Sequence, residues 1–345
     1  MKTRAAIVGG LLVFGLCGPA MVGTSAASAA GAASAAGAAA PAGGRAIDPA
    51  LFEPGSCLSY GPTSGNRHES VFLDAGHGSI DPGTIGVTET GQTIYEANET
   101  LAVELDALTQ LRAQGFTVIV SRTRNSPVAR PLSGDLSDGL YTLQGDLRDV
   151  ASRDVCADMA KADILVGMYF DAGVSTQNAG SITGYDTDRP FAADNLRLGT
   201  LIQTDVLAAM NAQGWGIPDD GVVSDTLLGG PPLSEAAANY DHLVLLGPAD
   251  PGYFTTPSTM PGALIEPLFI TDPYEGTLAN SALGQEVIAR GLTTAIGQYF
   301  GPSTKVATGP VKSAQAKGRR RARASDRTPS KHRHGADGTQ TATGA

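Results

Sequence analysis

Two spacings of apolar residues alternate along this chain. Apolar residues recur every three or four positions in four segments, which predicts helices at 95–114, 143–161, 191–213 and 282–300. Between them lie short apolar runs of strand length, at 71–74, 116–123, 163–170, 180–185, 242–247 and 262–269. Strands that alternate with helices through right-handed crossovers build an α/β domain. We therefore predict a three-layer α/β domain over residues 56–300, with a twisted, mostly parallel sheet flanked by helices.

Helix- and strand-breaking residues mark where this pattern stops. The stretch WGIPDDGVVSDTLLGGPPLSE, at 215–235, is so rich in Gly, Pro and Asp that it predicts a long surface loop, which could line a substrate groove. Residues 31–55 begin with an Ala/Gly-rich run that has little to bury and therefore predict a flexible linker. We expect ordered structure to begin near Cys57.

The two ends of the chain differ from its middle. Residues 1–30 carry Lys2 and Arg4, then an apolar run, then small residues, which is the layout of a secretory signal peptide. That run is too short to span a membrane, and no later stretch predicts a transmembrane segment. Residues 301–345 hold ten Lys and Arg but only two Asp, a net charge of +8 in a chain whose total is −10. We expect a disordered basic tail on an acidic body.

These features predict a secreted protein that is extracellular or attached to the cell wall. The basic tail would bind anionic wall polymers rather than nucleic acid. Without the signal peptide the chain keeps two cysteines, Cys57 and Cys156, and in an oxidising compartment an even pair favours a disulfide. Two separate buried thiols are the alternative.

Three histidines can serve the domain, because His332 and His334 lie in the tail. His77 follows the first predicted strand in the glycine-rich stretch LDAGHG, at the sheet edge where α/β proteins bind ligands. Glu96 begins the next predicted helix, and such helices start at the same edge. Because an imidazole and a carboxylate are both suitable zinc ligands, the two residues predict a zinc site.

Glu266 is a carboxylate in the otherwise apolar run GALIEPLF, where burial without a partner would be costly. Two explanations stay open at this point. An arginine such as Arg153 could pair with Glu266, or Glu266 could face the crevice of His77 as an acid/base group.

Five blocks of the sequence, in order, resemble the secreted zinc N-acetylmuramoyl-L-alanine amidases of the cell-wall Amidase_3 family. The blocks are FLDAGHGSIDPGTIG, YEANETL, SRT, RDVCADMAKADILVGMYFDAG and PGALIEPLFITDP. This resemblance implies a twisted, mostly parallel sheet flanked by helices. It also implies a hydrolase that acts on peptidoglycan and cleaves the amide between the lactyl group of N-acetylmuramic acid and the L-alanine of the stem peptide.

The resemblance assigns roles to four residues. His77 and Glu96 correspond to two zinc ligands, Glu266 to the catalytic glutamate, and Arg153 to an arginine with a structural role. Zinc would polarise the amide oxygen and lower the pKa of its bound water, while Glu266 takes the proton and delivers it to the departing amine.

One position departs from the family pattern. Where the family has its second histidine ligand, this chain has Tyr169, in GMYFDAG. A catalytic zinc normally has three protein ligands, and a phenol with a pKa of about 10 is a poor one. Asp171 lies two residues further on and would share a strand face with Tyr169, and His242 could reach in from a neighbouring strand. Asp171 and His242 are therefore the two candidate substitutes.

Two other functions stay open on the sequence alone. A chain that has lost tight zinc binding would be a catalytically silent homologue that binds peptidoglycan or regulates its turnover. A zinc carboxypeptidase-like peptidase of similar architecture is the third possibility.

Overall fold

The computed structural model describes residues 39–228 and 240–302. The predicted signal peptide at 1–30 lies outside the described residues, and so does the basic tail beyond position 302. The described residues all belong to one structural unit.

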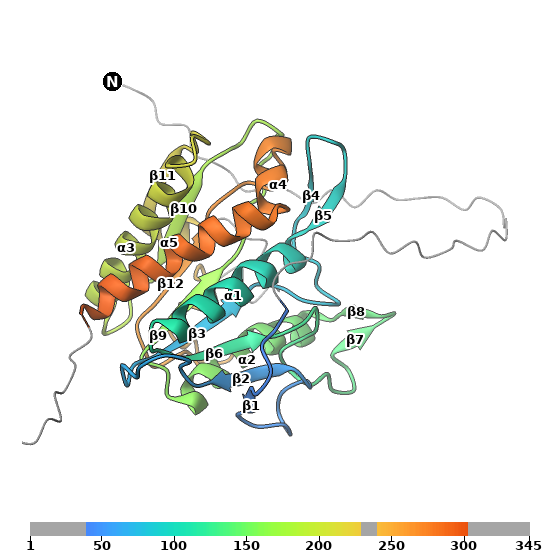
Figure 1. Ribbon diagram of the computed structural model, residues 1–345. Coiled ribbons are helices and arrows are strands. Elements are labelled where there is room, and N and C mark those ends of the chain that lie inside the picture. Colours follow the sequence, from blue (N-terminus) through green and yellow to red (C-terminus); the bar gives the residue numbers. More distant parts are fainter. Residues whose placement is uncertain (1–38, 229–239, 303–345) are drawn as a thin grey trace, which may run out of the picture. The chain divides into compact units, whose positions relative to one another are not determined.

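An eight-stranded sheet forms the centre of this unit, in the order β1-β2-β6-β3-β9-β12-β10-β11 (Figure 1). Its four middle strands are parallel: β6 (Thr117–Arg122), β3 (Ser70–Ala75), β9 (Ile164–Met168) and β12 (Gly262–Glu266). On one side, β2 (Ser56–Tyr60) runs antiparallel to β6, and β1 (Arg45–Ala46) antiparallel to β2. On the other side, β10 (Ser181–Tyr185) runs antiparallel to β12, and β11 (Asp219–Ser224) runs parallel to β10.

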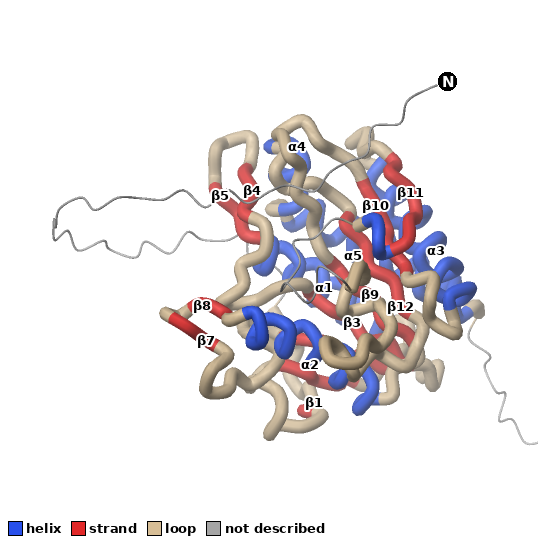
Figure 2. The backbone as a smooth tube through the Cα atoms, turned by 180° about the vertical axis from the view of Figure 1, so that it is seen from behind, coloured by secondary structure: helices blue, strands red, loops and turns tan. Residues whose placement is uncertain are grey.

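Helices cover both faces of this sheet, as Figures 1 and 2 show from opposite sides. The long helices are α1 (Glu96–Ala113), α2 (Leu143–Ala160), α3 (Ala192–Asn211) and α5 (Ala282–Phe300). The shorter elements are α4 (Pro273–Ala279), the 3-10 helix η1 (Asp225–Leu227), and two hairpins, β4 (Ile85–Val87) with β5 (Thr93–Tyr95) and β7 (Leu136–Ser137) with β8 (Leu140–Tyr141). The mostly parallel sheet between helices confirms the predicted fold class and all four predicted long helices.

Side-chain alternation along the strands divides the core into two layers. Val71 and Leu73 of β3 face the core that α1, α3 and α5 cover, whereas Phe72 faces the smaller core on the α2 side. The period of two is what a strand requires when both of its faces are buried. Among the described residues, no helix has both the length and the apolar character needed to cross a bilayer.

A disulfide joins Cys57 of β2 to Cys156 of α2, and both cysteines are fully buried in the smaller core. The predicted pairing is therefore confirmed. The bond ties the antiparallel side of the sheet to the one long helix that packs on that face among the described residues.

Three sequence-based expectations are wrong in part. Residues 219–224 form β11 although a continuous loop was expected at 215–235, because β10 supplies a parallel partner that turn-forming residues do not reveal. The predicted strand at 242–247 is instead a buried turn, in which the backbone N–H groups of Leu246 and Gly247 both donate to the carbonyl of Leu243. Ordered structure also begins before position 56, since β1 pairs with β2 and Phe52 is buried within the expected linker.

The reversal of strand direction between β12 and β10 gives the sheet two chemically distinct ends. The parallel strands β3, β9 and β12 all finish at one end, which is where His77, Tyr169 and Glu266 lie. In the β10–β12 register Ile182 pairs with Glu266 and Gly184 with Leu264, so the finish of β10 lies beside the start of β12. Residues that follow β10 and β11 therefore lie at the opposite end from His77.

Candidate active site

His77 lies on a tight loop that follows β3. Its backbone φ of 62° is left-handed, and the neighbouring Asp81 exchanges backbone hydrogen bonds with Gly78. The Nδ1 atom of His77 lies 2.6 Å from Oδ2 of Asp81, and its Nε2 atom lies 3.1 Å from Oε1 of Glu96. The imidazole keeps 25% of its side-chain surface exposed, so a ligand can reach it. Each ring nitrogen therefore faces one carboxylate.

Glu96 is fixed by the start of α1. Its Oε1 accepts a hydrogen bond from the backbone N–H of Phe170 at 2.9 Å, and its Oε2 accepts one from Thr84 at 2.8 Å. The side chain is only 3% exposed, and the helix N-terminus favours its negative charge. Burial disfavours a charged imidazole, but Glu96 and Asp81 outweigh this effect and raise the pKa of His77 to about 10.

Tyr169 lies beside His77, with the two rings edge to face at 5.3 Å between centroids. A Cβ at Gly76 would lie 2.5 Å from the tyrosine ring, so only glycine allows this approach. The Tyr169 hydroxyl donates to Oδ2 of Asp74 at 3.0 Å. Burial and the charge of Asp74 raise the pKa of Tyr169 well above its usual value, so the phenol keeps its proton.

Arg153 positions this part of the site through the backbone. Its guanidinium lies 2.7 Å from Asp74 and 3.2 Å from Asp149, and it donates to the carbonyl of His77 at 3.1 Å. Its two acidic partners are thus Asp74 and Asp149, and Glu266 has a different one. The structure therefore does not show the pairing of Glu266 with Arg153, the first of the two explanations.

Glu266 ends β12 and shares a hydrogen bond with the carboxyl group of Asp171. Asp171 follows β9, and its backbone bridges to Phe269 beyond β12. Burial, followed by the charges of Asp171 and Glu96, raises the pKa of Glu266 well above its usual value. Burial also raises the pKa of Asp171 to about 6. Both carboxyl groups therefore lie within electrostatic reach of Glu96, and Glu266 also within reach of His77.

The structure thus brings His77, Glu96, Tyr169, Asp171 and Glu266 to one end of the sheet. His242, the other candidate ligand, contacts a different pair of carboxylates, Asp186 and Asp225. Sequence reasoning missed Asp81 and Asp74 as partners in the site. Both flank His77 in the stretch LDAGHGSID, so an acidic residue four positions after a candidate ligand was the available signal. We call His77, Asp81, Glu96, Asp171 and Glu266 the His77 cluster.

The fold and the His77 cluster define an α/β protein with an acidic, histidine-containing site at the carboxyl ends of its parallel strands. The chain belongs to the Amidase_3 family, described as N-acetylmuramoyl-L-alanine amidase, whose model matches residues 71–298. It is similar to the N-acetylmuramoyl-L-alanine amidase LytC of Bacillus subtilis, with 26% identity over 232 residues, 67% of this chain and 36% of LytC. The chain therefore spans little more than a third of that relative.

Two further proteins are similar over about the same share of the chain. The uncharacterised protein YqiI of Bacillus subtilis is 22% identical over 233 residues, which are 67% of this chain and 85% of YqiI. The solved structure of the CwlD amidase from Clostridioides difficile, in complex with the GerS lipoprotein, is 21% identical with a TM-score of 0.49 and covers 67% of this chain and 98% of that one.

Proposed function

We propose that this protein is a secreted, zinc-dependent N-acetylmuramoyl-L-alanine amidase. Its substrate is peptidoglycan, in which it hydrolyses the amide between N-acetylmuramic acid and the L-alanine of the stem peptide. The observation that carries the proposal is the meeting of His77, Glu96 and Glu266, from three separate segments, in a chain of the amidase family.

Two donors at this end of the sheet support a zinc site. His77 Nε2 and Glu96 Oε1 are 3.1 Å apart, close to the spacing of two ligands that each bind one ion at about 2.0–2.2 Å. Asp81 holds the other ring nitrogen, as carboxylates commonly do behind a histidine that binds zinc. Asp171 and Glu266 also lie within electrostatic reach of Glu96, so three carboxyl groups gather at this place, an excess that a divalent cation would relieve.

Asp171 is the third ligand that these contacts favour. The Tyr169 hydroxyl is engaged with Asp74 and keeps its proton, which makes it a poor zinc ligand. His242 is engaged with Asp186 and Asp225. Asp171 hydrogen-bonds Glu266 and lies within electrostatic reach of Glu96, and a carboxylate is a normal zinc ligand. His77, Glu96 and Asp171 would hold the ion once Asp171 moves closer, because among the described residues only Asp186, Asp225 and His242 already have three ligand atoms within 4.8 Å of one another.

Zinc, when bound, supplies a Lewis acid that polarises the scissile carbonyl group. Glu266 takes a proton from the water that attacks the carbonyl carbon, and it returns this proton to the nitrogen as the C–N bond breaks. The products are a carboxylic acid on the lactyl group and a free amine on L-alanine. Asp81 and the backbone contact from Arg153 keep the His77 ring in one orientation throughout.

Purified protein, metal-free and zinc-loaded, tests the proposal on intact peptidoglycan. We expect new N-terminal alanine amines to appear only with zinc, at about one equivalent of zinc for this site. Asp171→Ala should lose that equivalent, whereas Tyr169→Phe should keep it. Free stem peptides without the sugar are the control substrate. Cleavage of those peptides would identify a carboxypeptidase-like peptidase and overturn the amidase assignment.

A catalytically silent homologue is the second candidate, and the Tyr169–Asp74 hydrogen bond is the observation that favours it. A side chain engaged with Asp74 occupies the position where the family has a histidine ligand. Such a protein would bind peptidoglycan, would hold no zinc at the His77 cluster and would release no amines. Binding assays on isolated walls, run beside the amine assay, separate the two candidates.

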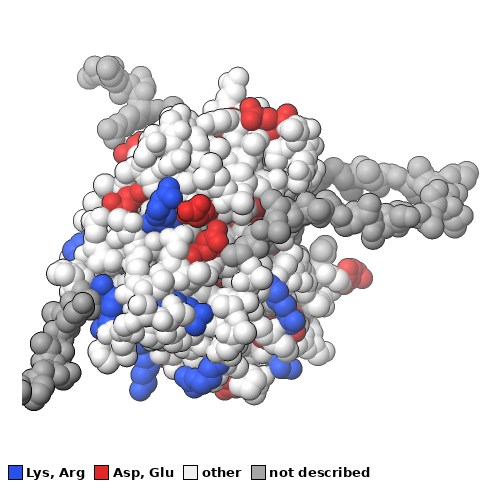
Figure 3. Space-filling model, viewed as in Figure 1, with Lys and Arg blue, Asp and Glu red and all other residues white. Residues whose placement is uncertain are grey.

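We infer that the protein acts outside the cell, at the wall, and that the basic tail at 301–345 attaches it to anionic wall polymers. On the face drawn in Figure 3, acidic and basic side chains form separate small groups among uncharged residues. That face of the described unit offers no continuous basic surface to a polyanion. The ten Lys and Arg of the tail therefore supply the attraction in this proposal.

A further inference from the structure

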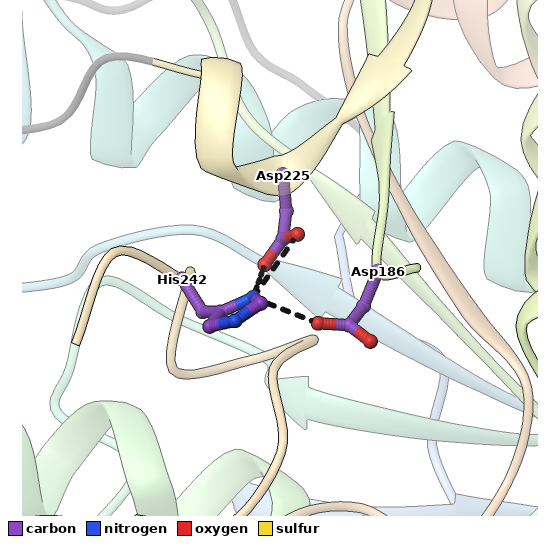
Figure 4. A group of neighbouring side chains, drawn as sticks. All are labelled: Asp186, Asp225 and His242. Atoms are coloured by element: carbon purple, nitrogen blue, oxygen red, sulfur yellow. Dashed lines mark hydrogen bonds and ion pairs between the residues drawn. The ribbon is translucent and has the colours of Figure 1, made fainter. Parts of the chain in front are cut away.

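A second histidine with two carboxylates lies at the opposite end of the sheet. Asp186 directly follows β10, Asp225 opens η1 directly after β11, and His242 comes from the segment 240–247 (Figure 4). Because β10 and β11 are parallel, their two aspartates emerge at the same end. We call Asp186, Asp225 and His242 the His242 cluster.

Both carboxylates point at the same ring nitrogen. His242 Nδ1 lies 2.9 Å from Oδ2 of Asp186 and 3.2 Å from Oδ2 of Asp225, as the dashed lines in Figure 4 show. An imidazole nitrogen carries at most one proton, so it can donate to only one of these carboxylates. The side chains of Asp186 and Asp225 are both 0% exposed, so water cannot compensate the other one from bulk solvent.

Asp186 shows most clearly that two carboxylates share one possible donor. Its Oδ1 accepts backbone N–H bonds from Asp188 and Arg189, each at 2.8 Å. Its Oδ2 is buried, and within the described residues it receives no hydrogen bond of good geometry, although it is aimed at the imidazole. The guanidinium of Arg189 is committed to three carbonyl groups, of Leu246, Gly247 and Ser258, and so does not neutralise the carboxylate.

We propose that Asp186, Asp225 and His242 form a site for a divalent transition-metal ion, separate from the His77 cluster. One ligand atom from each residue can be chosen so that all three lie within 4.8 Å of one another. Ions bound at about 2.0–2.2 Å have ligand atoms separated by about 2.9–3.5 Å, the range in which both N–O distances fall. Two carboxylate oxygens with one imidazole nitrogen suit zinc better than calcium, which prefers oxygen ligands alone.

The ion would act as a structural cross-link. Its ligands come from the end of β10, from the end of the edge strand β11 and from a segment without regular secondary structure, and Asp225 and His242 are 17 positions apart. The same segment places Val244, Leu245 and Leu246 in the core. A bound ion would fix this buried turn to the edge of the sheet, where the described residues provide few regular backbone hydrogen bonds to hold it.

Zinc content and thermal unfolding of the full chain test this site. The protein is stripped with a chelator and re-equilibrated with Zn²⁺ alone, as wild type, His242→Ala, His77→Ala and His68→Ala. His68 is exposed and serves as the matched histidine control. We expect His242→Ala to lose one equivalent of zinc that His77→Ala and His68→Ala retain. Zinc should raise the unfolding temperature of His77→Ala by about 5 °C and that of His242→Ala by much less.

The result does not depend on the amidase proposal. If the His77 cluster binds no zinc, wild type still takes up the one equivalent that His242→Ala lacks. Equal zinc content and equal thermal shifts in His242→Ala and His68→Ala would overturn the second site. Should His242→Ala fail to fold, Asp225→Asn makes the same comparison, because its amide oxygen can still accept the backbone N–H of Leu243.

Discussion

Each end of the sheet sets one histidine against two close carboxylates, but the two arrangements differ. At His77 the carboxylates lie on opposite ring nitrogens, Asp81 at Nδ1 and Glu96 at Nε2. At His242 both aspartates converge on Nδ1. A protonated imidazole can donate one hydrogen bond to each carboxylate in the first arrangement. In the second arrangement, its Nδ1 can donate to only one of the two carboxylates.

This difference indicates separate roles for the two clusters, with chemistry at His77 and metal binding at His242. At His77 a proton can take the place of a metal ion, which agrees with the pKa of about 10. Under the proposed function, zinc would displace that proton when it binds. At His242 one Nδ1 proton can bond only one of the two carboxylates. A metal ion can bind both carboxylates and the imidazole nitrogen at the same time. Under the two proposals, hydrolysis belongs to the His77 cluster and structural stabilisation to the His242 cluster.

The largest effect should come from Glu266, the one member of either cluster that is proposed to move protons in the reaction. Glu266→Gln removes the acid/base group and is expected to lower kcat by about 10²- to 10⁴-fold. Zinc content should stay at the wild-type value, since Glu266 is not a proposed ligand. Amine release from peptidoglycan measures kcat, with His68→Ala as the control. Undiminished turnover in Glu266→Gln would remove the proposed mechanism.

Asp81 tests whether the arrangement on opposite nitrogens matters for metal binding. Asp81→Asn keeps the side-chain shape but removes the negative charge behind His77. We expect zinc affinity at the His77 cluster to fall by about 10- to 100-fold, as for other partners behind zinc-binding histidines. Competition with a chromogenic chelator measures the affinity. A matching loss in the His77→Ala background would mean that Asp81 acts on both sites, contrary to the comparison.

Glu104 is the reference case, a buried carboxylate with no histidine beside it. Burial raises its pKa to about 8, although Arg122 and the N–H of Ala75 partly offset this. Because the folded-state pKa lies above the unfolded one, the folded protein holds an extra proton between about pH 4.5 and pH 8. The Glu104 contribution to stability is therefore fully present at low pH and is lost as the pH rises through 8.

Glu104 should lower the unfolding free energy of wild type as the pH rises from 5 to 9. We expect Glu104→Gln to make that decrease smaller by about 1–3 kcal/mol. Urea denaturation of chelator-treated protein at several pH values measures the slope. Glu99→Gln is a useful comparison, since burial raises the pKa of Glu99 only to about 7. An unchanged slope in Glu104→Gln would mean that this carboxyl group is already ionised in the folded protein.

The smallest effect should come from the tail, which supplies no residue to either cluster. Deleting 301–345 removes a net charge of +8 and should weaken binding to isolated walls a few-fold at low salt. The two forms should bind equally at high salt, because ions screen exposed charges. Sedimentation with isolated walls measures binding. Equal binding at low salt would exclude the electrostatic role.

Much of the fold could be predicted because it depends on local periodicity. The strand at 71–74 and the helix at 282–300 show strong patterns, and the structure places β3 and α5 there. The apolar run at 242–247 was predicted to be a strand, but it forms a turn. Val244, Leu245 and Leu246 are buried there, and burial alone does not distinguish a turn from a strand. The strand β11 was hidden because its pairing with β10 is a tertiary contact.

The same division holds for the sites. His77, Glu96 and Glu266 each stand in a family-like block, and parallel strand ends made their meeting predictable. The His242 cluster depends on the antiparallel entry of β10 beside β12, which places Asp186 at the far end of the sheet. The local sequence around Asp186 and Asp225 gives no sign of that reversal, so His242 stood beside Asp171 as a candidate third ligand at His77.

The disulfide gives the two clusters different histories during folding. Cys57 and Cys156 are 99 positions apart, and the covalent ring they close contains His77, Asp81 and Glu96. Closing a ring of that size restricts the unfolded chain by about 4–5 kcal/mol on the chain-entropy model. The His242 cluster lies wholly outside the ring. The redox state of this bond therefore changes the chain search for the three members of the His77 cluster inside the ring, while Asp171, Glu266 and the whole His242 cluster lie outside it.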